Sequence, residues 1–434
     1  MIIEVYGLGY VGLPLAVRLA SAGFDVIGID KDSVKIQRLH TGKLLNSEEF
    51  LRTDFEVSKN TNKLSIAEFA TKSDDPKIGI ICVPTPIPED NVASDKFVKQ
   101  ATESFLNNAK KGDIIILESS VEVGTTEKIQ QMIESRGFRV GKDFGLAFCP
   151  ERIDPKNKKW NLENIPRVIY CSDNQTFDVC KEIYFHVNNA NLTRVSSSKV
   201  AEIVKSFENT FRLVNISLVN ELAMLCDKLQ IDINEIISAA STKPFGFMPF
   251  YPSAGAGGHC IPKDPKLLLE SAKKLNIKFN ILENALTVNH YMPKYIADSI
   301  EKVISENNLK SSVIVCGLSY KQDIEDMRDS SGFKVITELK KKDMKVTGYD
   351  PYYQEALKER YMIENHLNNP INTISNLDDN SINEFDCICI VQHHTKIKFD
   401  IEKIYNNSKI SFIYDCQNML DFNPESKTIL RKLG

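Results

Sequence analysis

A glycine-rich turn near the start of the chain constrains the fold most. Residues 7–12, Gly-Leu-Gly-Tyr-Val-Gly, directly follow the β-branched run Ile2–Tyr6 and open an amphipathic run over residues 14–22. Glycines at this spacing permit a tight turn, close approach of the backbone to a pyrophosphate, and close packing of a helix on a strand. Asp30 ends the next apolar run, residues 26–29, where its carboxylate can accept hydrogen bonds from a ribose. Because an acid there repels a 2′-phosphate, the pattern favours NAD over NADP, and the alternative is a glycine turn with a solvated aspartate.

Short β-branched runs alternate with helical patterns at both ends of the chain, which indicates βαβ units on parallel sheets. Between the two ends, residues 196–243 contain neither Gly nor Pro, and apolar residues recur at steps of three or four. This predicts a helix of about 30 residues, roughly 45 Å long. The predicted strands are residues 2–6, 26–29, 78–83, 114–117, 145–148, 168–171, 313–316 and 346–349. The apolar stripe of the helix consists of Val200, Val204, Phe207, Phe211, Val214, Leu218, Leu222 and Leu225.

A helix of this length suits a spine between domains or a dimer interface. We therefore expect an α/β protein with two Rossmann-like parallel-sheet domains joined by a long-helix central domain. The predicted boundaries are 1–195 for an NAD-binding domain, 196–308 for the central domain, and 309–434 for a second nucleotide-binding fold.

The second Rossmann-like domain echoes the first. Residues 346–350, Val-Thr-Gly-Tyr-Asp, match residues 26–30, Val-Ile-Gly-Ile-Asp. Gly317 lies 33 positions before Asp350, ten more than separate Gly7 from Asp30, and the glycine fingerprint is lacking. The second domain is therefore expected to bind a nucleotide differently, if at all.

The composition narrows the class of protein. The chain has 54 Lys and Arg against 58 Asp and Glu, a formal net charge of −4, which disfavours an electrostatic nucleic-acid binder. No apolar run approaches the roughly 18 residues of a membrane span, and the N-terminal run resembles a strand and not a signal peptide. Ten cysteines are spread singly, which is typical of reduced thiols. We expect a cytoplasmic enzyme that binds neither nucleic acid nor membranes.

No cysteine spacing predicts a metal site. Cys387 and Cys389 are the only closely spaced pair, and we expect their sulfurs to point to opposite faces of a strand. Zinc binding is therefore not predicted.

One glycine-rich segment, residues 255–265, contains a candidate nucleophile. Cys260 lies beside Lys263 and just ahead of Asp264-Pro265, which is typical of a helix start. A helix N-terminus and a nearby cation both lower the pKa of a thiol and so activate it. The alternative, a buried structural cysteine, fits a polar glycine-rich loop poorly. His259 is not assigned as its base, because chain neighbours point apart in an extended loop.

Three polar residues share one face of the long helix. Lys205, Asn209 and Arg212 are spaced i, i+4 and i+7. Lys can supply positive charge and Asn a hydrogen bond to a developing oxyanion, and a solvated helix face is the alternative. Two turns at strand ends, containing Thr85 and Ser120, are either hydroxyl-capped loops or ligand contacts.

Taken together, these motifs resemble the UDP-glucose/GDP-mannose dehydrogenase family over essentially the whole chain. The resemblance implies oxidation of the C6 alcohol of a nucleotide sugar to a carboxylate, a four-electron reaction that uses two NAD and water. It also implies a helical spine that forms a homodimer and a C-terminal domain that binds UDP. The matching segments are residues 7–12, 83–86, 149–152, 205 with 209, 257–260 with 263–264, and 317–321 through 326–328.

The resemblance also implies roles for individual residues. Cys260 would add to an aldehyde as a thiohemiacetal, and a second hydride transfer would leave a thioester that water hydrolyses. Lys205 and Asn209 would stabilise the developing charge on oxygen, Asp264 would order water or move protons, and Glu151 would assist the acid/base steps. The expected cofactor contacts are Gly7, Gly9, Tyr10, Val11, Gly12, Asp30, Lys35, Thr85, Ser120 and Arg328. The expected substrate contacts are Arg152, Lys205, Asn209, Arg212, Tyr251, Gly257, Tyr320 and Lys321.

The sugar is predicted from residues 243–252, which resemble the bacterial and archaeal UDP-N-acetylglucosamine 6-dehydrogenase branch of the family. Their aromatic residues and methionine can form an apolar wall for an acetamido methyl group, or simply core. UDP-N-acetylmannosamine is the near alternative, and UDP-glucose the third. Pro155 stands where glucose-type relatives often carry a second glutamate, so hydrolysis relies on Glu151, Asp264 or bound water.

Two classes of protein remain as rivals. A hydroxyacid-type dehydrogenase also combines a Rossmann domain with a Lys-x-x-x-Asn helix, but it transfers two electrons and needs no cysteine. A non-catalytic sensor of NAD or a nucleotide sugar would keep the glycine fingerprint without a nucleophile.

Overall fold

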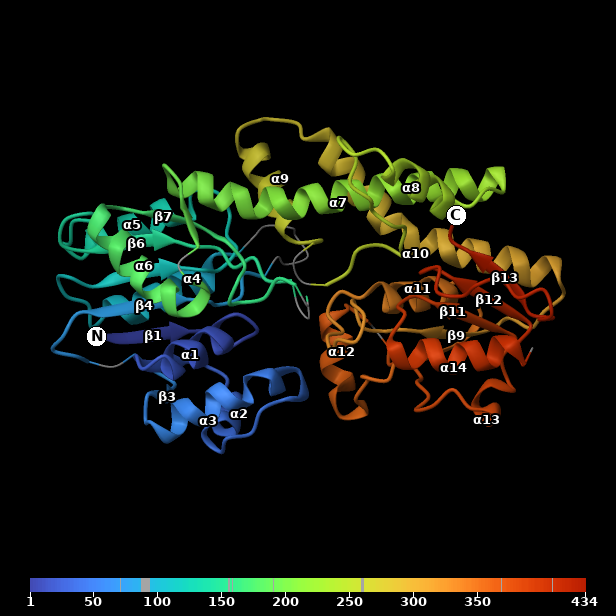
Figure 1. Ribbon diagram of the computed structural model, residues 1–434, viewed down its shortest axis with the longest axis horizontal. Helices are drawn as coiled ribbons and strands as arrows, with labels where there is room; N and C mark the ends of the chain where they lie inside the picture. Colours follow the sequence, from blue (N-terminus) through green and yellow to red (C-terminus); the bar gives the residue numbers. More distant parts are fainter. Residues whose placement is uncertain are drawn as a thin grey trace. The chain divides into compact units, whose positions relative to one another are not determined.

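The computed structural model describes residues 1–434 except 71, 87–93, 155–156, 158, 190, 259–260, 368 and 408, and only the backbone of residues 46, 47 and 379. Cys260, His259 and Pro155 therefore lie outside the described residues. The chain divides into two compact units (Figure 1). Unit 1 contains residues 1–208 and 266–278, and unit 2 contains residues 209–265 and 279–434.

Unit 1 is built on an eight-stranded sheet in the order β3-β2-β1-β4-β5-β6-β7-β8. Neighbouring strands are parallel except β6 and β7, which are antiparallel. All six strands predicted in this region are present, each within two residues of its expected ends. The strands are β1 (Ile2–Tyr6), β2 (Asp25–Ile29), β3 (Leu64–Ala67), β4 (Lys77–Ile81), β5 (Ile114–Leu117), β6 (Gly145–Phe148), β7 (Arg167–Cys171) and β8 (Leu192–Arg194).

Strands β3 and β8, at the two edges of this sheet, were not predicted from the sequence. Both are short, and most of their residues are half-buried or exposed. An edge strand needs no continuous apolar run, so these segments lacked the pattern that identified the central strands.

Helices cover both faces of the first sheet. One buried cluster joins strand residues such as Ile3 and Ile80 to α1, α3 and α6, and a second joins residues such as Ile81 and Leu117 to α4 and α5. The alternation along each strand sends neighbouring side chains to opposite clusters. The helices are α1 (Gly12–Ser21), α2 (Ser33–His40), α3 (Arg52–Asn60), α4 (Lys96–Leu106), α5 (Thr125–Ser135) and α6 (Asn174–Asn188), with a 3₁₀ turn, η1, at Asn46–Leu51.

The predicted long helix is present as α7 (Ser198–Leu229), and it ends where Gln230 adopts a positive φ of 56°. The apolar stripe is not buried as expected: Val200, Phe207, Phe211, Leu218 and Leu225 are all exposed in the single chain. The face that packs inward carries small and polar residues as well as apolar ones: Ala201, Glu202, Ser206, Thr210, Leu213, Ser217, Val219, Asn220, Ala223 and Cys226.

Unit 2 contains a fully parallel five-stranded sheet in the order β10-β9-β11-β12-β13. One face packs on α10 and α11, and the other packs on α14. The strands are β9 (Ser312–Cys316), β10 (Lys345–Tyr349), β11 (Cys387–Ile390), β12 (Phe412–Asp415) and β13 (Ile429–Lys432). The helices are α8 (Ile233–Ser241), α10 (Asn280–Glu306), α11 (Ser331–Lys340), α12 (Lys358–Glu364), α13 (Asp379–Ile382) and α14 (Thr395–Asn406), with a 3₁₀ turn, η2, at Glu355–Leu357. Helix α9 (Asp264–Lys274) begins at the predicted Asp264 and continues into unit 1.

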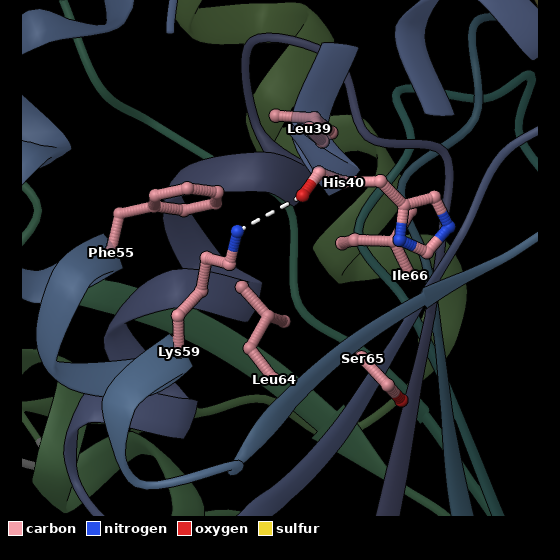
Figure 2. Close-up of a pocket in the computed structure, with 7 residues that line it drawn as sticks. All are labelled: Leu39, His40, Phe55, Lys59, Leu64, Ser65 and Ile66. Carbon is pink, nitrogen blue, oxygen red and sulfur yellow. Dashed lines mark hydrogen bonds between the residues drawn. The ribbon is translucent and has the colours of Figure 1, made fainter. Parts of the chain in front are cut away.

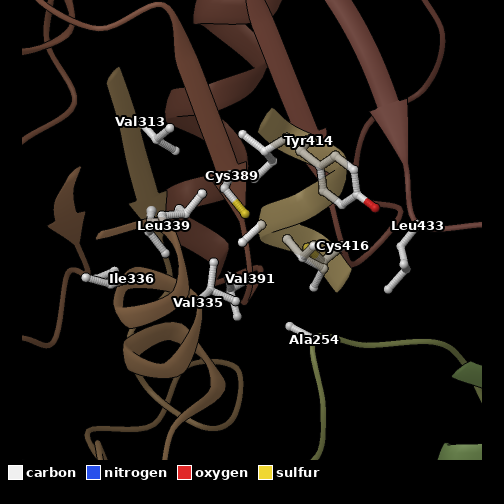
Figure 3. Packing of buried hydrophobic residues seen from close by; sticks show 14 of the residues in the cluster. Ala254, Val313, Val335, Ile336, Leu339, Cys389, Val391, Tyr414, Cys416 and Leu433 are labelled. Atoms are coloured by element: carbon white, nitrogen blue, oxygen red, sulfur yellow. The ribbon is translucent and has the colours of Figure 1, made fainter. Parts of the chain in front are cut away.

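The cysteines of unit 2 correct one expectation. Cys387 and Cys389 lie in the same buried cluster, while Ile388 and Ile390 lie in the cluster on the opposite face. The prediction of opposite faces was wrong, because residues two apart on a strand share a face. Figure 3 shows Cys389 and Cys416 among the apolar side chains of this core.

Within the described part of the chain, all nine cysteines are free thiols, and no group of three or more His, Cys, Asp or Glu residues could hold a metal ion. None of the helices described here combines the length and apolarity needed to cross a membrane.

Candidate active site

The glycine turn of unit 1 has the shape that a dinucleotide requires. Gly7 has a φ of +89°, and its N–H donates to the carbonyl of Ile29 over 2.7 Å. A Cβ on Gly12 would lie 2.0 Å from the Gly7 oxygen, so helix α1 can approach the turn only without a side chain there. A Cβ on Gly9, in contrast, would meet nothing within 4 Å. The turn is therefore closed on the protein side and open beside Gly9, where a pyrophosphate can approach the start of α1.

Asp30 is held ready to accept hydrogen bonds. Its Oδ2 accepts from the backbone N–H of Leu8 at 2.8 Å and from Lys35 Nζ at 2.7 Å, and its Oδ1 accepts from the N–H of Asp32 at 3.0 Å. Burial raises the pKa of this carboxyl, but the hydrogen bonds from Lys35 and Asp32 outweigh burial and leave the pKa below its usual value. The carboxylate stays ionised at neutral pH, as a ribose acceptor must. Lys35, an expected cofactor contact, pairs with this carboxylate.

The two strand-end turns predicted as cofactor contacts are joined to each other. Thr85 Oγ1 donates to the carbonyl of Ser120 over 2.6 Å, and Ser119 Oγ donates to the carbonyl of Val83 over 2.7 Å. These turns follow β4 and β5, and β4 lies next to β1 in the sheet. Nucleotides bind at such a point, where the strand order reverses and the carboxyl ends of the strands open a crevice.

A buried ionic cluster, not predicted from the sequence, holds the loop after β6. Arg167, at the start of β7, is fully buried and pairs with both Glu118 and Glu151. Tyr184 donates to Glu118, and its ring stacks on the Arg167 guanidinium. Burial raises the pKa of Glu118, an effect that the charge of Arg167 opposes. The sequence feature that could have indicated this cluster is a lone arginine at the start of an apolar strand.

Both carboxylate oxygens of Glu151 accept hydrogen bonds. Its Oε1 accepts from the backbone N–H groups of Arg152 at 2.6 Å and Ile153 at 2.7 Å, while its Oε2 accepts from Arg167. This arrangement fixes the loop after β6. The carboxylate therefore orients the backbone N–H groups of Arg152 and Ile153.

Arg152 is also bound within unit 1. Its Nε and Nη2 donate to the two carboxylate oxygens of Glu208, at 3.1 and 2.5 Å, and its Nη1 donates to the carbonyl of Pro166 at 2.9 Å. This expected substrate contact therefore fastens the loop to helix α7.

On α7 itself, Lys205 and Asn209 are half-buried, one turn apart, and Arg212 is exposed. Asn209 Nδ2 donates to Asp264 Oδ2 over 2.6 Å, so the structure brings two predicted catalytic residues together. Asp264 is only 1% exposed, and its Oδ1 has no hydrogen-bond partner among the described residues. A buried carboxylate oxygen in this state is costly, and it marks a place where water or a substrate hydroxyl can bind.

The glycine-rich segment that leads to Cys260 is clamped to helix α10. Asn289 Oδ1 accepts from the N–H of Ala256 over 2.7 Å, and Asn289 Nδ2 donates to the Ala256 carbonyl over 3.1 Å. Asn289 is 3% exposed. Asn289 was not predicted from the sequence, because an amide that holds a distant backbone leaves no periodic pattern.

Two further contacts fix the same segment. Ser253 N–H donates to Asn220 Oδ1 on α7 over 2.9 Å, and Ser331 Oγ donates to the carbonyl of Gly255 over 2.6 Å. The segment is therefore attached to α7, α10 and α11 within unit 2.

Gly257 and Tyr320, both expected substrate contacts, belong to two segments that contact each other through Gly258 and the Tyr320 ring. A Cβ on Gly258 would lie 2.6 Å from the Tyr320 ring, and one on Gly257 would lie 2.7 Å from the carbonyl oxygen of Asp329. Lys321 is half-buried beside Tyr320 in the chain, and Tyr251 is exposed. Arg328, an expected cofactor contact, forms a two-pronged pair with Asp326.

A separate pocket of unit 1 lies away from these residues. Figure 2 shows it between α2, α3 and β3, with Lys59 donating to the His40 carbonyl over 3.0 Å. Its volume is about 220 Å³. Leu64 is the first residue of β3, so the pocket includes the amino end of that strand, whereas ligands of parallel sheets bind at the carboxyl ends. None of the predicted site residues lines it.

Comparison with known proteins covers nearly the whole chain. Models of the UDP-glucose/GDP-mannose dehydrogenase family match residues 1–188 (NAD binding domain), 199–291 (central domain) and 314–422 (UDP binding domain). A UDP-N-acetyl-D-mannosamine dehydrogenase of Methanococcus aeolicus is 33% identical over 427 residues, covering 96% of this chain and 91% of the relative. A UDP-N-acetyl-D-glucosamine 6-dehydrogenase of Pseudomonas aeruginosa is 31% identical and covers 99% of both chains.

Solved structures agree with the sequence comparison. The UDP-D-ManNAc dehydrogenase of Pyrococcus horikoshii superimposes with a TM-score of 0.85 at 28% identity, covering 100% of this chain and 99% of the other.

Proposed function

Because the chain belongs to the UDP-glucose/GDP-mannose dehydrogenase family and is an NAD-dependent UDP-sugar dehydrogenase, we propose that it oxidises the C6 hydroxyl of a UDP-N-acetylhexosamine to a carboxylate through a thioester on Cys260. The observation that carries this proposal is the Asn209–Asp264 pair. It places an amide donor next to a buried carboxylate whose second oxygen has no described partner. Cys260 lies four positions before that carboxylate in the sequence.

Four electrons leave the substrate in two steps. When bound, NAD accepts one hydride in each step, so two molecules are reduced per sugar. After the first step, the Cys260 thiolate adds to the C6 aldehyde carbon, and a proton neutralises the oxygen. Loss of the second hydride from C6, together with the proton of this hydroxyl, leaves a thioester. Water then cleaves the C–S bond, which gives the carboxylate and restores the thiol.

The remaining residues stabilise the developing charge and position the attacking water. The Lys205 ammonium and the Asn209 amide stabilise the negative oxygen at C6. Asp264 orients Asn209 through Oδ2, and its Oδ1 orders the attacking water. Glu151, held by three donors, fixes the loop of Arg152.

For the sugar itself, we propose UDP-N-acetylglucosamine, with UDP-N-acetylmannosamine as the second candidate. Residues 243–252 support an N-acetyl sugar, since Phe245, Phe247 and Met248 are exposed and available to contact a methyl group. Identities of 33% to a mannosamine enzyme and 31% to a glucosamine enzyme do not separate the two epimers.

We also propose a homodimer formed through α7. Phe207, Leu218 and Leu225 are 57%, 63% and 53% exposed, an apolar stripe that a second copy would cover. The division into domains 1–195, 196–308 and 309–434 and a cytoplasmic location belong to the same proposal. The free thiols of the described cysteines support a reducing compartment.

The test is NADH formation with UDP-N-acetylglucosamine, UDP-N-acetylmannosamine, UDP-glucose and GDP-mannose at matched concentrations. An N-acetylated UDP-sugar should give the highest kcat/KM. Preference for GDP-mannose or UDP-glucose would overturn the assignment of the sugar. Binding of all four without turnover would favour a sensor, and one NADH with a released carbonyl compound would favour a two-electron dehydrogenase.

A further inference from the structure

The two sheets of this protein carry the same strand-turn-helix at corresponding positions. The first glycines, Gly7 and Gly317, have φ angles of +89° and +90°, and each donates its N–H to the end of the neighbouring strand, over 2.7 and 2.8 Å. A Cβ on Gly12 would meet the Gly7 oxygen at 2.0 Å, and one on Gly332 would meet the Gly317 oxygen at 2.6 Å. The third glycine of the fingerprint is therefore present in unit 2, ten residues later than expected, which is why its sequence showed no fingerprint.

The acids that follow are also counterparts. Leu8 N–H donates to Asp30 Oδ2 over 2.8 Å, and Leu318 N–H donates to Asp350 Oδ2 over 2.7 Å. In each case Oδ1 accepts from the N–H two residues further along, at 3.0 Å for Asp30 and 2.8 Å for Asp350. Asp350 thus occupies the position that reads a ribose in a dinucleotide-binding fold.

The surroundings of the two acids differ. Apart from backbone N–H groups, Asp30 is bound by the half-buried Lys35. Asp350 is buried, and its Oδ2 accepts additional bonds from Ser319 N–H and Oγ, both at 2.8 Å, and from His394 Nε2 at 3.0 Å. Because Asp323 N–H donates to His394 Nδ1 over 2.7 Å, the imidazole proton belongs on Nε2, facing Asp350. These internal bonds occupy the acceptor that a ribose would need.

The longer connection in unit 2 forms a loop that these bonds fasten. Residues 319–329 lie between the first and third glycine positions, where a dinucleotide-binding fold has its pyrophosphate turn. Ser319 binds Asp350, and the Asp323 carboxylate accepts from Thr395 N–H at 2.9 Å and Oγ1 at 2.7 Å. The loop carries Tyr320, whose ring contacts Gly258, and Lys321.

We propose that Asp350 and His394 are positioning residues that hold the 319–329 loop in the conformation that receives the UDP-sugar, so that the second sheet binds no dinucleotide. Asp30 is expected to bind the cofactor ribose in unit 1, whereas its counterpart Asp350 in unit 2 binds groups of the protein itself. This inference rests on the proposed function, because the loop contains two of the expected substrate contacts.

Asp350→Asn tests the inference, with Asp30→Asn as the matched control at the equivalent position. Asp350→Asn should raise KM for the UDP-sugar about 10-fold or more and leave the dissociation constant for NADH within 2-fold, because a displaced loop weakens substrate binding. Asp30→Asn should do the reverse, since losing a charged acceptor weakens NADH binding by about 10-fold. A loss of NADH affinity in Asp350→Asn, or unchanged substrate KM, would overturn the proposal.

His394 variants separate positioning from general loss of structure. His394→Gln keeps a donor near Asp350 and should recover most of the substrate affinity that His394→Ala loses. Equal defects in both variants would contradict a positioning role for His394.

Amide hydrogen exchange of residues 319–329, measured without substrate, tests the anchoring of the loop whichever sugar the enzyme oxidises. Exchange should rise in Asp350→Asn and His394→Ala but not in Asp30→Asn. No rise would refute the anchoring even if the enzyme oxidises a UDP-sugar, whereas a rise in a protein that oxidises none would refute the proposed function alone.

Discussion

Asn289 holds the backbone of Ala256 by both polar atoms of its carboxamide, accepting from the N–H at 2.7 Å and donating to the carbonyl at 3.1 Å. Ala256 lies four residues before Cys260. Helix α10 therefore controls the path of the chain that delivers the proposed nucleophile.

Replacing Asn289 with Ala should lower kcat by about 100-fold, because small displacements of a reacting group cost this much. Two buried backbone groups would also lose their partners, at about 1–3 kcal/mol each, so the melting temperature should fall. NADH affinity should not change. Thr287→Ala, at an exposed position on the same helix, is the control and should leave both kcat and melting temperature unchanged.

Asp264→Asn should slow hydrolysis of the thioester more than its formation, since the buried Oδ1 is proposed to order water. Mixing this variant with NAD and the UDP-sugar should give a burst of NADH and a covalent adduct on Cys260 that intact-protein mass spectrometry detects. Asp298→Asn, at a half-buried position of α10 where the carboxylate pairs with Lys294 and Lys342, should show neither. A slow variant without any adduct would assign Asp264 to an earlier step.

Glu202 gives a prediction about pH. Its buried carboxylate accepts from Gly124 N–H at 2.7 Å and from Thr126 N–H and Oγ1 at 2.8 and 2.7 Å, and burial raises its pKa. Since Gln offers one acceptor oxygen and turns an NH₂ group toward a donor, Glu202→Gln should destabilise unit 1 by about 1–3 kcal/mol at neutral pH.

The sign of the pH effect follows from linkage. A carboxyl whose pKa is higher in the folded than in the unfolded state contributes stability that is lost as pH rises between the two values. The stability difference between wild type and Glu202→Gln should therefore grow as pH falls from 7 toward about 4.3, the ordinary value for Glu. Chemical unfolding at several pH values measures it, and a gap that shrinks on acidification would contradict the raised pKa.

The exposed stripe of α7 predicts the oligomeric state. Wild type should sediment as a dimer, and Leu218→Glu with Leu225→Glu should sediment as a monomer, because two buried charges would oppose association. Arg212→Glu, an exposed polar position on the same helix, serves as the charge control for association. A monomeric wild type would refute the proposed interface.

The fold could be predicted where the residue pattern within a single segment identifies the structure of that segment. The central strands and α7 follow from apolar periodicity, and the Asp30 site follows from glycines and an acid at fixed spacing. The same periodicity could not show that the α7 stripe stays uncovered in one chain, because apolarity does not say what covers it. Edge strands β3 and β8 were missed for lack of an apolar run.

The supporting residues leave less signal in the sequence than the proposed reacting residues do. Arg167, Asn289 and His394 act on groups far away in the sequence, and none belongs to a spacing pattern. Only the folded chain shows that Glu151 is held by Arg167 or that the acid of the second sheet is enclosed by His394.

The ratio of NADH formed to UDP-sugar consumed tests the central claim most directly. The Cys260 thioester route predicts two NADH for each sugar, with a carboxylate as the only sugar product. Cys260→Ala should bind NADH normally and give no carboxylate. A ratio of one NADH per sugar, or carboxylate formation by Cys260→Ala, would contradict the account.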